Sequence, residues 1–478
     1  MITIFYVFFL ILIINSIIAF ITVFWSKREV STIWAWLLVL FLLPVLGFVV
    51  FWLFGRRISD KRIFDFTSQK KIEQEQLLLN RKLTDKEIKK IADSTKQLIY
   101  LLEANNDAVL TSGNQVDLFY NGPKLFQELM KDIENAKSSI HIEFFTIYSD
   151  ALGKMLIKKL EEKAKQGVEV RVIYDQFGSH GRQNKLYKKL RQNGGIIYPF
   201  LMRRSQVLSF RFNFRLHRKI VVIDGKTGYI GGFNVGDQYL GELEKFGNWR
   251  DTHLKVIGDS VLSLQARFFT DWNATSDKNT KLLFKSKYFP LIKPKRGDLM
   301  QIVSSGPDSN KQQIKQMYLK MFSAAKKEII VQTPYLIPDN TMMETLMIAL
   351  ESGVKVKIMI PNKPDHPFVY RATEYYAKQL QDLGAEVFIY NNGFLHTKVI
   401  IVDEEISSIG SANLDIRSFS LNFEANAIIY SSKIGKQLKD QFILDVQSSI
   451  KIDKKYFDSQ PFFRKFRQNV SRLLSPIL

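Results

Sequence analysis

Two segments of this chain repeat one pattern of polar residues at the same spacing, and this duplication constrains the fold more than any other feature of the sequence. Residues 217–234 and residues 396–413 both read His-x-Lys-x4-Asp-x6-Gly-(Gly or Ser)-x-Asn. Shorter matches lie upstream, between residues 140–145 and 329–334 and between residues 167–170 and 353–356. The chain is therefore an internal duplication, and we expect its halves to meet within residues 278–296.

From about residue 105 onward, short β-branched runs alternate with amphipathic helical patterns, which is typical of α/β domains. Residues 168–174 and 354–360 are predicted to be buried strands, each preceded by a helix. The apolar faces of these two helices carry Leu152, Met155, Leu156, Leu160 and Ala164 in the first, and Met342, Met343, Leu346, Met347 and Leu350 in the second. We interpret both faces as core.

The N-terminal segment is strongly apolar. Residues 2–25 contain only four polar side chains, and a helix of that length spans the roughly 30 Å hydrocarbon core of a bilayer. A second apolar run covers residues 32–54, with Pro44 and Gly47 at positions that membrane helices tolerate. The two runs predict a transmembrane helical hairpin. A cleaved signal peptide is the alternative, but the first run lacks a basic start and a cleavage site of the Ala-x-Ala type.

Charges beside the two runs predict the orientation of the hairpin. The link carries Lys27 and Arg28, whereas the residues after the second run include Arg56, Arg57, Lys61, Arg62, Lys70 and Lys71. The larger basic cluster favours a cytoplasmic C-terminal body. The expected organisation is a hairpin (1–58), a helical connector (59–104), a first α/β domain (105–285) and a second one (286–478) that ends in an amphipathic segment.

Composition narrows the range of partners and chemistries. The chain has a net charge of +21, which attracts anionic partners such as acidic lipid headgroups or nucleic acid. The membrane hairpin favours lipid, and we expect no nucleic acid partner. Cysteine is absent, which excludes disulfides, thiolate metal sites and a cysteine nucleophile. The sequence leaves the oligomeric state open.

The repeated motif suits phosphoryl transfer. Residues 216–223 and 395–402 have the apolar pattern of strands, in which residues i and i+2 project from the same face, so each His and Lys should point together. A turn and a second strand should then bring the Asn back toward the pair. Histidine can attack phosphorus or protonate a leaving oxygen, while Lys and Asn stabilise negative charge in the transition state. One turnover needs both histidines, and these groups require no metal or organic cofactor.

A carboxylate should hold each imidazole in the required tautomer, and Asp251 and Glu424 are the candidates. Asp224 and Asp403 lie at the turns, where we expect them to brace the fold. The complete predicted site comprises His217, Lys219, Asp224, Asn234, Asp251, His396, Lys398, Asp403, Ser411, Asn413 and Glu424. The histidines outside the repeat are interpreted as structural or surface residues, namely His141, His180, His253 and His366.

The doubled motif resembles the HKD motifs of the phospholipase D superfamily over residues 105–478, and residues 36–47 and 54–56 resemble the hairpin of bacterial cardiolipin synthases. The resemblance implies two α/β/α domains around a pseudo-two-fold active site. It also implies that one phosphatidylglycerol gives its phosphatidyl group to a histidine and a second accepts it, yielding cardiolipin and glycerol. By analogy, His217 is the nucleophile and His396 the acid and base. The halves differ at one position, where the first has Gly232 and the second Ser411.

Alternative functions share the same histidine chemistry. Water could replace the lipid acceptor, which would make the chain a phospholipase or, with less support from the membrane hairpin, a nuclease. A non-catalytic scaffold on acidic membranes is a further alternative, but both halves keep complete His, Lys and Asn sets.

Two basic and aromatic segments could contact lipid. Arg203, Arg204, Arg211 and Arg215 alternate with Phe210, Phe212 and Phe214, which fits either a solvated edge strand or a rim that binds lipid phosphates, with Arg211 and Arg215 as substrate-binding candidates. Near the C-terminus, residues 462–474 form an amphipathic pattern that we interpret as an interfacial membrane helix rather than a cap on the body.

Overall fold

The computed structural model describes residues 2–24, 30–43, 46–47, 50–51, 64, 91–106, 108–180, 184–201, 214–290, 297–309, 311–363 and 365–475. The chain divides into two compact units, of which the first contains Met1–Asp60 with Met202–Phe214 and the second contains Lys61–Leu201 with Arg215–Leu478.

The N-terminal unit contains two helices, α1 (Ile2–Phe24) and α2 (Val30–Leu42). Val23, Leu40 and Phe51 form a small buried cluster, and the ring of Trp36 meets that of Phe51 edge to face at 5.1 Å. Among the residues described, no helix combines the length and the apolar character needed to cross a bilayer. The two predicted spans are therefore not confirmed. The basic residues that predict the orientation, at positions 27–28, 56–57, 61–62 and 70–71, lie outside the described residues.

The larger unit holds both copies of the repeat, in a first half (108–290) and a second half (297–475). The strands of the first half are β1 (Thr111–Phe119), β2 (Ser139–Phe144), β3 (Glu169–Tyr174), β4 (Ile196–Pro199), β5 (Arg215–Leu216), β6 (Ile220–Ile223), β7 (Thr227–Gly231), β8 (Trp249–Arg250) and β9 (His253–Ile257). Those of the second half are β10 (Asp298–Ser305), β11 (Glu328–Gln332), β12 (Leu336–Ile337), β13 (Lys355–Pro361), β14 (Glu386–Tyr390), β15 (Phe394–Leu395), β16 (Val399–Val402), β17 (Ile406–Gly410), β18 (Leu414–Asp415), β19 (Asn422–Tyr430) and β20 (Ser449–Ile452).

The helices follow the same duplication. They are α5 (Asp93–Asn106), α6 (Gly122–Asn135), α7 (Ala151–Lys165), α8 (Asn184–Gln192) and α9 (Ser260–Thr275), then α10 (Gln313–Ala324), α11 (Asn340–Glu351), α12 (Pro367–Asp382), α13 (Ile416–Ser420), α14 (Ser432–Gln447), α15 (Lys454–Asp458) and α16 (Phe462–Leu473). Short 3-10 helices occur at η2 (Asp237–Leu240), η3 (Lys278–Thr280) and η4 (Ser286–Tyr288). The repeat extends to the helix caps, since Asp150 caps α7 and Asp339 caps α11, each by accepting a bond from a backbone N–H.

One continuous sheet runs through both halves, in the order β20-β14-β13-β11-β16-β17-β19-β10-β1-β9-β7-β6-β2-β3-β4. Its register repeats, because Ile140 on β2 faces Ile223 on β6 just as Ile329 on β11 faces Val402 on β16. The halves join in the middle of the sheet, where β1 pairs with β10. The α/β fold with duplicated domains is thus confirmed.

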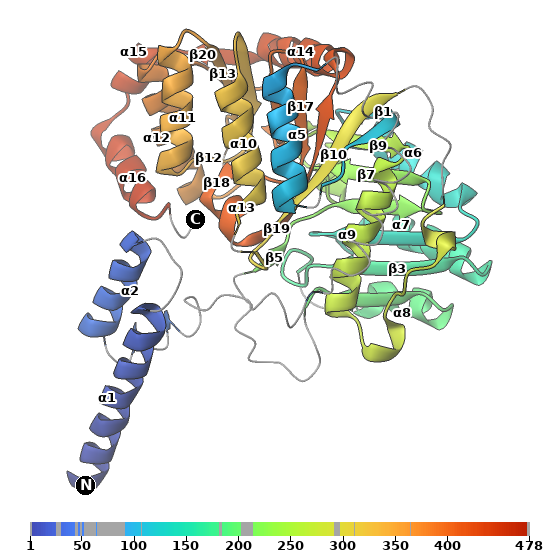
Figure 1. Cartoon of the computed structure of the whole chain (residues 1–478), viewed down its shortest axis with the longest axis horizontal. Coiled ribbons are helices and arrows are strands. Elements are labelled where there is room, and N and C mark those ends of the chain that lie inside the picture. Colours follow the sequence, from blue (N-terminus) through green and yellow to red (C-terminus); the bar gives the residue numbers. More distant parts are fainter. Residues whose placement is uncertain are drawn as a thin grey trace. The chain divides into compact units, whose positions relative to one another are not determined.

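Helices cover the strands of each half on both faces (Figure 1). One core packs α6, α7 and α8 against the first half, and a second packs α5, α10, α11 and α12 against the second half. A third core lies between them and joins apolar residues of β6, β7 and β9 to those of β16, β17 and β19, with α9 and α14 contributing. The inner faces of the two halves therefore pack against each other.

The local predictions are largely confirmed. The expected strands at 168–174 and 354–360 are β3 and β13, and the expected helices before them are α7 and α11. One core assignment is wrong, because Met155 is 47% exposed and Ile157 occupies the buried position instead. Of the predicted connector, α5 is described, and most of residues 59–90 lie outside the described residues.

Candidate active site

Each His-x-Lys segment lies between two short strands, so the prediction of one continuous strand through it is wrong. Residues 217–219 separate β5 from β6, and residues 396–398 separate β15 from β16. The strand before each motif pairs with the opposite half, β5 with β19 and β15 with β8, whereas the strand after it pairs within its own half. The motif therefore lies at the crossing point between the two halves.

The two imidazoles are held by carboxylates from opposite halves. His217 Nδ1 lies 2.8 and 2.9 Å from the two carboxylate oxygens of Glu424, which belongs to the second half. His396 Nδ1 lies 2.6 Å from Oδ2 of Asp251, which belongs to the first half. With Nδ1 bound to a carboxylate, Nε2 is the ring nitrogen that can meet a substrate. Neither half provides a complete site by itself.

Different neighbours orient the two carboxylates. Glu424 accepts hydrogen bonds from the Ser411 hydroxyl at 2.5 Å and from the Asn422 amide at 3.1 Å. Asp251 accepts one from the backbone N–H of Thr252 at 2.7 Å. A Cβ atom added to Gly232 would overlap the carboxylate of Asp251. The Gly–Ser difference between the repeats therefore matches the carboxylates, since glycine leaves room for Asp251 and serine binds Glu424.

We expect Gly232→Ala to reduce activity about 100-fold, because the added methyl group displaces the carboxylate that orients His396. Ser411→Gly is the matched change in the other half. It removes the hydroxyl that donates to Glu424 and accepts from the Ala425 N–H, without introducing a clash, and should lower activity roughly tenfold. Steady-state rates of both variants, with unfolding temperatures close to that of the parent chain, check the difference. Equal losses of activity in the two variants would show that activity does not depend on the space that Gly232 leaves for Asp251.

Each lysine lies beside its own histidine. Lys219 Nζ donates to the backbone carbonyl of His217 at 2.6 Å, and Lys398 Nζ contacts the corresponding carbonyl of His396 and lies 2.8 Å from its Nδ1. Burial lowers the pKa of Lys219 to about 7 and that of Lys398 to about 8, against the opposing effect of the nearby carboxylates. Both ammonium groups are thus poised to gain stability from an anion.

The electrostatics connect the two sets of residues. Burial lowers the pKa of His217, and the charges of Lys219 and Lys398 add to this effect. Burial and Lys398 lower the pKa of His396 to about 4, and Lys219 of the other half contributes in the same direction. The charge of each lysine therefore lowers the pKa of the histidine in the opposite half as well. The two sets of residues are thus close enough to interact electrostatically.

The site carboxylates remain ionised. Burial alone would raise the pKa of Asp251, but Lys398 and His396 outweigh it, so that the pKa lies below its usual value. Glu424 behaves in the same way, with His217 and Lys219 as the stabilising neighbours. Each neutral imidazole therefore faces a carboxylate, the arrangement that fixes its tautomer.

The motif aspartates lie away from the histidines. Asp224 accepts three hydrogen bonds, at 2.7–2.9 Å, from the backbone N–H groups of residues 137–139. Asp403 accepts three, each at 2.8 Å, from those of residues 326–328. Both have a positive φ of 53° at the turn between the paired strands. These bonds tie the turn to the start of β2 or β11, as a bracing role requires.

The motif asparagines are bonded within their own halves. Asn234 accepts from the Thr146 N–H at 3.2 Å and donates to the Tyr239 hydroxyl at 3.1 Å. Asn413 donates to Asp415 at 3.3 Å. Their expected contact with a bound anion stays a prediction.

Two buried arginines were missed by the sequence reasoning. Arg218 donates to the backbone carbonyl of Glu424 at 3.1 Å and forms an ion pair with Asp271 at 2.6 Å. Arg250 donates to the carbonyl of Asp251 at 2.6 Å and pairs with Asp445 at 2.8 Å. Each arginine thus anchors the backbone of a site carboxylate. They occupy non-equivalent places in the two repeats, so comparison of the copies gave no signal for them.

The remaining candidates fall outside the two histidine sets. His141 is buried, stacks on Phe268 at 4.7 Å and bonds to Gln265 at 2.7 Å. His253 is buried beside Gly231, and burial lowers its pKa to about 3. His180 and His366 are exposed. The Arg215 guanidinium lies 4.1 Å from the ring centroid of Phe177, whereas Arg203, Arg204 and Arg211 lie outside the described residues.

Comparison with known families defines the class of this site. The family described as "Cardiolipin synthase, PLD-like domain" matches residues 129–246 and 318–446, and that described as "Phospholipase_D-nuclease N-terminal" matches residues 4–56. A crystal structure of phosphatidylserine synthase from Haemophilus influenzae Rd KW20 superposes with a TM-score of 0.61 at 16% identity, covering 80% of this chain and 100% of that one. The likeness shows a shared fold. Fold and site together define an enzyme of the phospholipase D superfamily.

Curated relatives narrow this class. A cardiolipin synthase of Listeria monocytogenes serotype 4a (strain HCC23) is 47% identical over 482 residues, which cover 99% of each chain. The major cardiolipin synthase ClsA of Bacillus subtilis (strain 168) is 48% identical over 472 residues, or 98% of each chain. The cardiolipin synthase of Staphylococcus aureus (strain Mu50) is 44% identical over 98% of this chain and 95% of its own. This chain belongs to the bacterial cardiolipin synthases.

Proposed function

We propose that this chain is a membrane-bound phosphatidyltransferase that converts two molecules of phosphatidylglycerol into cardiolipin and glycerol through a phosphatidyl-histidine intermediate. The observation that carries the proposal is the pair of His–Lys–carboxylate sets, each completed by the opposite half. The cardiolipin synthases that match nearly the whole chain support the choice of lipid substrate.

In the first step, Nε2 of His217 attacks the phosphorus of one phosphatidylglycerol. A bond between nitrogen and phosphorus forms as the bond from phosphorus to the glycerol headgroup oxygen breaks. His396 gives its proton to that oxygen, and glycerol leaves. Glu424 stabilises the positive charge that develops on His217.

In the second step, His396 removes the proton from a headgroup hydroxyl of the second phosphatidylglycerol. The resulting oxygen attacks phosphorus, the bond to His217 breaks, and cardiolipin is released. His396 again carries the proton needed for the next cycle, so proton and phosphoryl group both balance over one turnover. Water at the acceptor position would give phosphatidic acid instead, which is the hydrolytic alternative.

Lys219 and Lys398, with Asn234 and Asn413, are proposed to surround the phosphorus and stabilise the charge on its oxygens. An anion between the lysines raises the pKa of both ammonium groups and of both histidines. A phosphodiester bound beside His396 is therefore expected to raise its pKa from about 4 and to favour the protonated form that an acid requires.

We expect binding of inorganic phosphate to take up protons near pH 8, where Lys219, with a pKa of about 7, is mostly neutral before the anion binds. Because the anion binds the protonated form better, affinity should weaken as the pH rises from 7 to 9. Calorimetry in buffers of different ionisation enthalpy measures the uptake. Lys219→Arg carries a permanent charge and should reduce the proton uptake. Lys226→Arg, at an exposed turn position, should leave the uptake unchanged. Uptake unchanged in Lys219→Arg would contradict this assignment.

The N-terminal hairpin is proposed to anchor the chain in the cell membrane through two spans, with the catalytic body in the cytoplasm. Its support is the apolar sequence of residues 2–25 and 32–54 and the family match over residues 4–56. We further propose the boundaries 1–58, 59–104, 105–285 and 286–478 for the hairpin, the connector and the two domains. Protease treatment of intact cells tests the orientation, because a cytoplasmic body resists digestion from outside.

Incubation of the purified chain with labelled phosphatidylglycerol tests the reaction. Cardiolipin with free glycerol supports transfer, and phosphatidic acid with glycerol supports hydrolysis. No product from a folded enzyme, in vesicles that contain both substrate and chain, supports the scaffold alternative. Either of the last two outcomes would overturn the proposed transfer.

A further inference from the structure

The C-terminal helix α16 is packed against the body by its polar side. Arg464 forms an ion pair with Glu374 on α12, and Gln468 donates to the same carboxylate at 3.1 Å and to Gln460 at 2.9 Å. Farther along, Ser471 is buried and Ser475 accepts a hydrogen bond from Tyr376 at 3.3 Å. Residues 464, 468, 471 and 475 recur at helical spacing, so one polar stripe makes these contacts.

The apolar side of the same helix faces away from the body. The exposed fractions are 75% for Phe462, 73% for Phe463, 56% for Phe466, 38% for Val470 and 76% for Leu473. A helix that capped a soluble body would bury this side and expose its glutamine and serine. Here the polarity is inverted, and the inversion is fixed by the buried carboxylate of Glu374, which would otherwise lose its partners.

Basic residues flank the exposed apolar side. Arg467 and Arg472 are exposed, and the Arg472 guanidinium lies 5.1 Å from the ring centroid of Tyr375. Lys465 lies on the other flank of the helix from Arg467, with its ammonium group 2.8 Å from the carbonyl of Asp458. Residues 462–473 contain no acidic side chain. An apolar stripe bordered by cations matches a surface that is apolar inside and anionic at its rim.

We propose that α16 is a second membrane contact, which lies in the headgroup region of an anionic bilayer with Phe462, Phe463, Phe466, Val470 and Leu473 inserted among the acyl chains. Its polar stripe stays bound to α12, so the contact also fixes how the catalytic body is turned toward the membrane. The inference rests on the proposed function in one respect, because it assumes that the enzyme acts at a lipid bilayer. It does not require the chemistry to be transfer.

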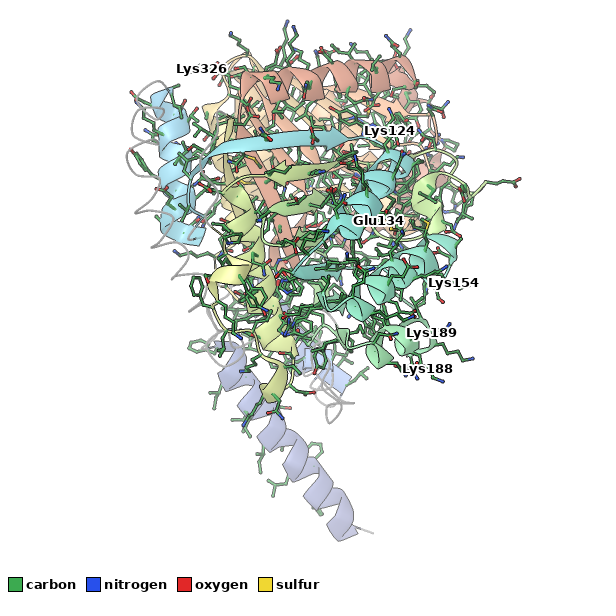
Figure 2. All side chains as sticks on the ribbon, turned by 90° about the vertical axis from the view of Figure 1, so that its right-hand side faces the viewer. Lys124, Glu134, Lys154, Lys188, Lys189 and Lys326 are labelled. Carbon is green, nitrogen blue, oxygen red and sulfur yellow. The ribbon has the colours of Figure 1, made fainter. Side chains whose placement is uncertain are left out.

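The absence of cysteine from the chain makes a single-site fluorescence test possible. Phe466→Cys is labelled with an environment-sensitive dye, and the full-length chain is placed in vesicles of phosphatidylcholine with or without phosphatidylserine. Lys188→Cys, on α8 of the first half, is the control, since Lys188 extends from the surface in Figure 2 and is exposed. Phosphatidylserine supplies the negative charge without being the proposed substrate.

We expect the dye at position 466 to emit at shorter wavelength and to be quenched by lipids with a nitroxide on the upper acyl chain, most strongly in vesicles that contain phosphatidylserine. The dye at position 188 should show neither effect. Adding Phe462→Ser and Leu473→Ser should abolish the quenching at 466 without lowering the unfolding temperature, because both side chains are exposed.

Three outcomes would overturn the proposal. The first is a dye at 466 that is no more quenched by lipid than the dye at 188. The second is a dye at 466 that emits at shorter wavelength but is not quenched by the nitroxide lipids. This result would mean that a second copy or the N-terminal hairpin covers the helix. The third is a drop in unfolding temperature on serine substitution, which would make α16 a cap. A chain that makes no cardiolipin but still shows lipid quenching at 466 would contradict the proposed function and leave this inference intact.

Discussion

His217→Ala and His396→Ala are each expected to reduce the conversion of phosphatidylglycerol to cardiolipin by at least about 10⁴-fold. The first removes the proposed nucleophile and the second the proposed acid and base. Thin-layer separation of labelled lipids measures the rate. His180→Ala is the matched control, because His180 is exposed and bonds to Tyr148 rather than to either site carboxylate.

A substrate with a better leaving group separates the two roles. Phosphatidyl-p-nitrophenol releases an anion that needs no proton, so His396→Ala should recover formation of the covalent intermediate with this substrate, whereas His217→Ala should not. Rescue of His217→Ala alone would reverse the assignment of the histidines. Near-normal cardiolipin synthesis by either variant would contradict a site shared by the two halves.

Glu424→Gln and Asp251→Asn are expected to lower activity by roughly 10²–10⁴-fold. At Glu424, an amide can donate to Nδ1 of His217, which moves the ring proton to Nε2 and blocks attack on phosphorus. At Asp251, the change removes the negative charge that stabilises protonated His396. With phosphatidyl-p-nitrophenol, whose leaving group needs no proton, the covalent intermediate should therefore form in Asp251→Asn but not in Glu424→Gln, as detected by a denaturing quench after mixing with labelled substrate.

A double variant that keeps a carboxylate beside His217 provides the conservative control. Ser411→Gly with Glu424→Asp places the first half's combination in the second half, and this variant should retain more activity than Glu424→Gln because an ion still faces His217. Equal activity of the two variants would show that the charge at position 424 is unimportant.

The repeat itself could be recognised from sequence because it depends on spacing. The paired His-x-Lys motifs, the alternation of strands and helices and the candidates Asp251 and Glu424 all follow from local patterns, and the structure places these carboxylates beside the two histidines. The register of β2 and β11 reproduces the sequence match between residues 140–145 and 329–334.

The exchange of partners between the halves could not be predicted in this way. Residues 216–223 look like one strand because every apolar position is buried, yet β5 and β6 pair with different halves. A hydrophobic pattern records burial and not the identity of the neighbouring strand. Arg218 and Arg250 were missed for a related reason, since each contacts residues more than a hundred positions away.

Among the described strands, three ladders cross between the halves, namely β1 with β10, β5 with β19 and β8 with β15. A hinge motion that separated the two halves would break all three ladders and would separate each imidazole from its carboxylate. Lipids are therefore expected to enter and leave while these ladders stay intact. The proposed intermediate on His217 adds an expectation of ping-pong kinetics, in which accumulated glycerol returns the intermediate to phosphatidylglycerol.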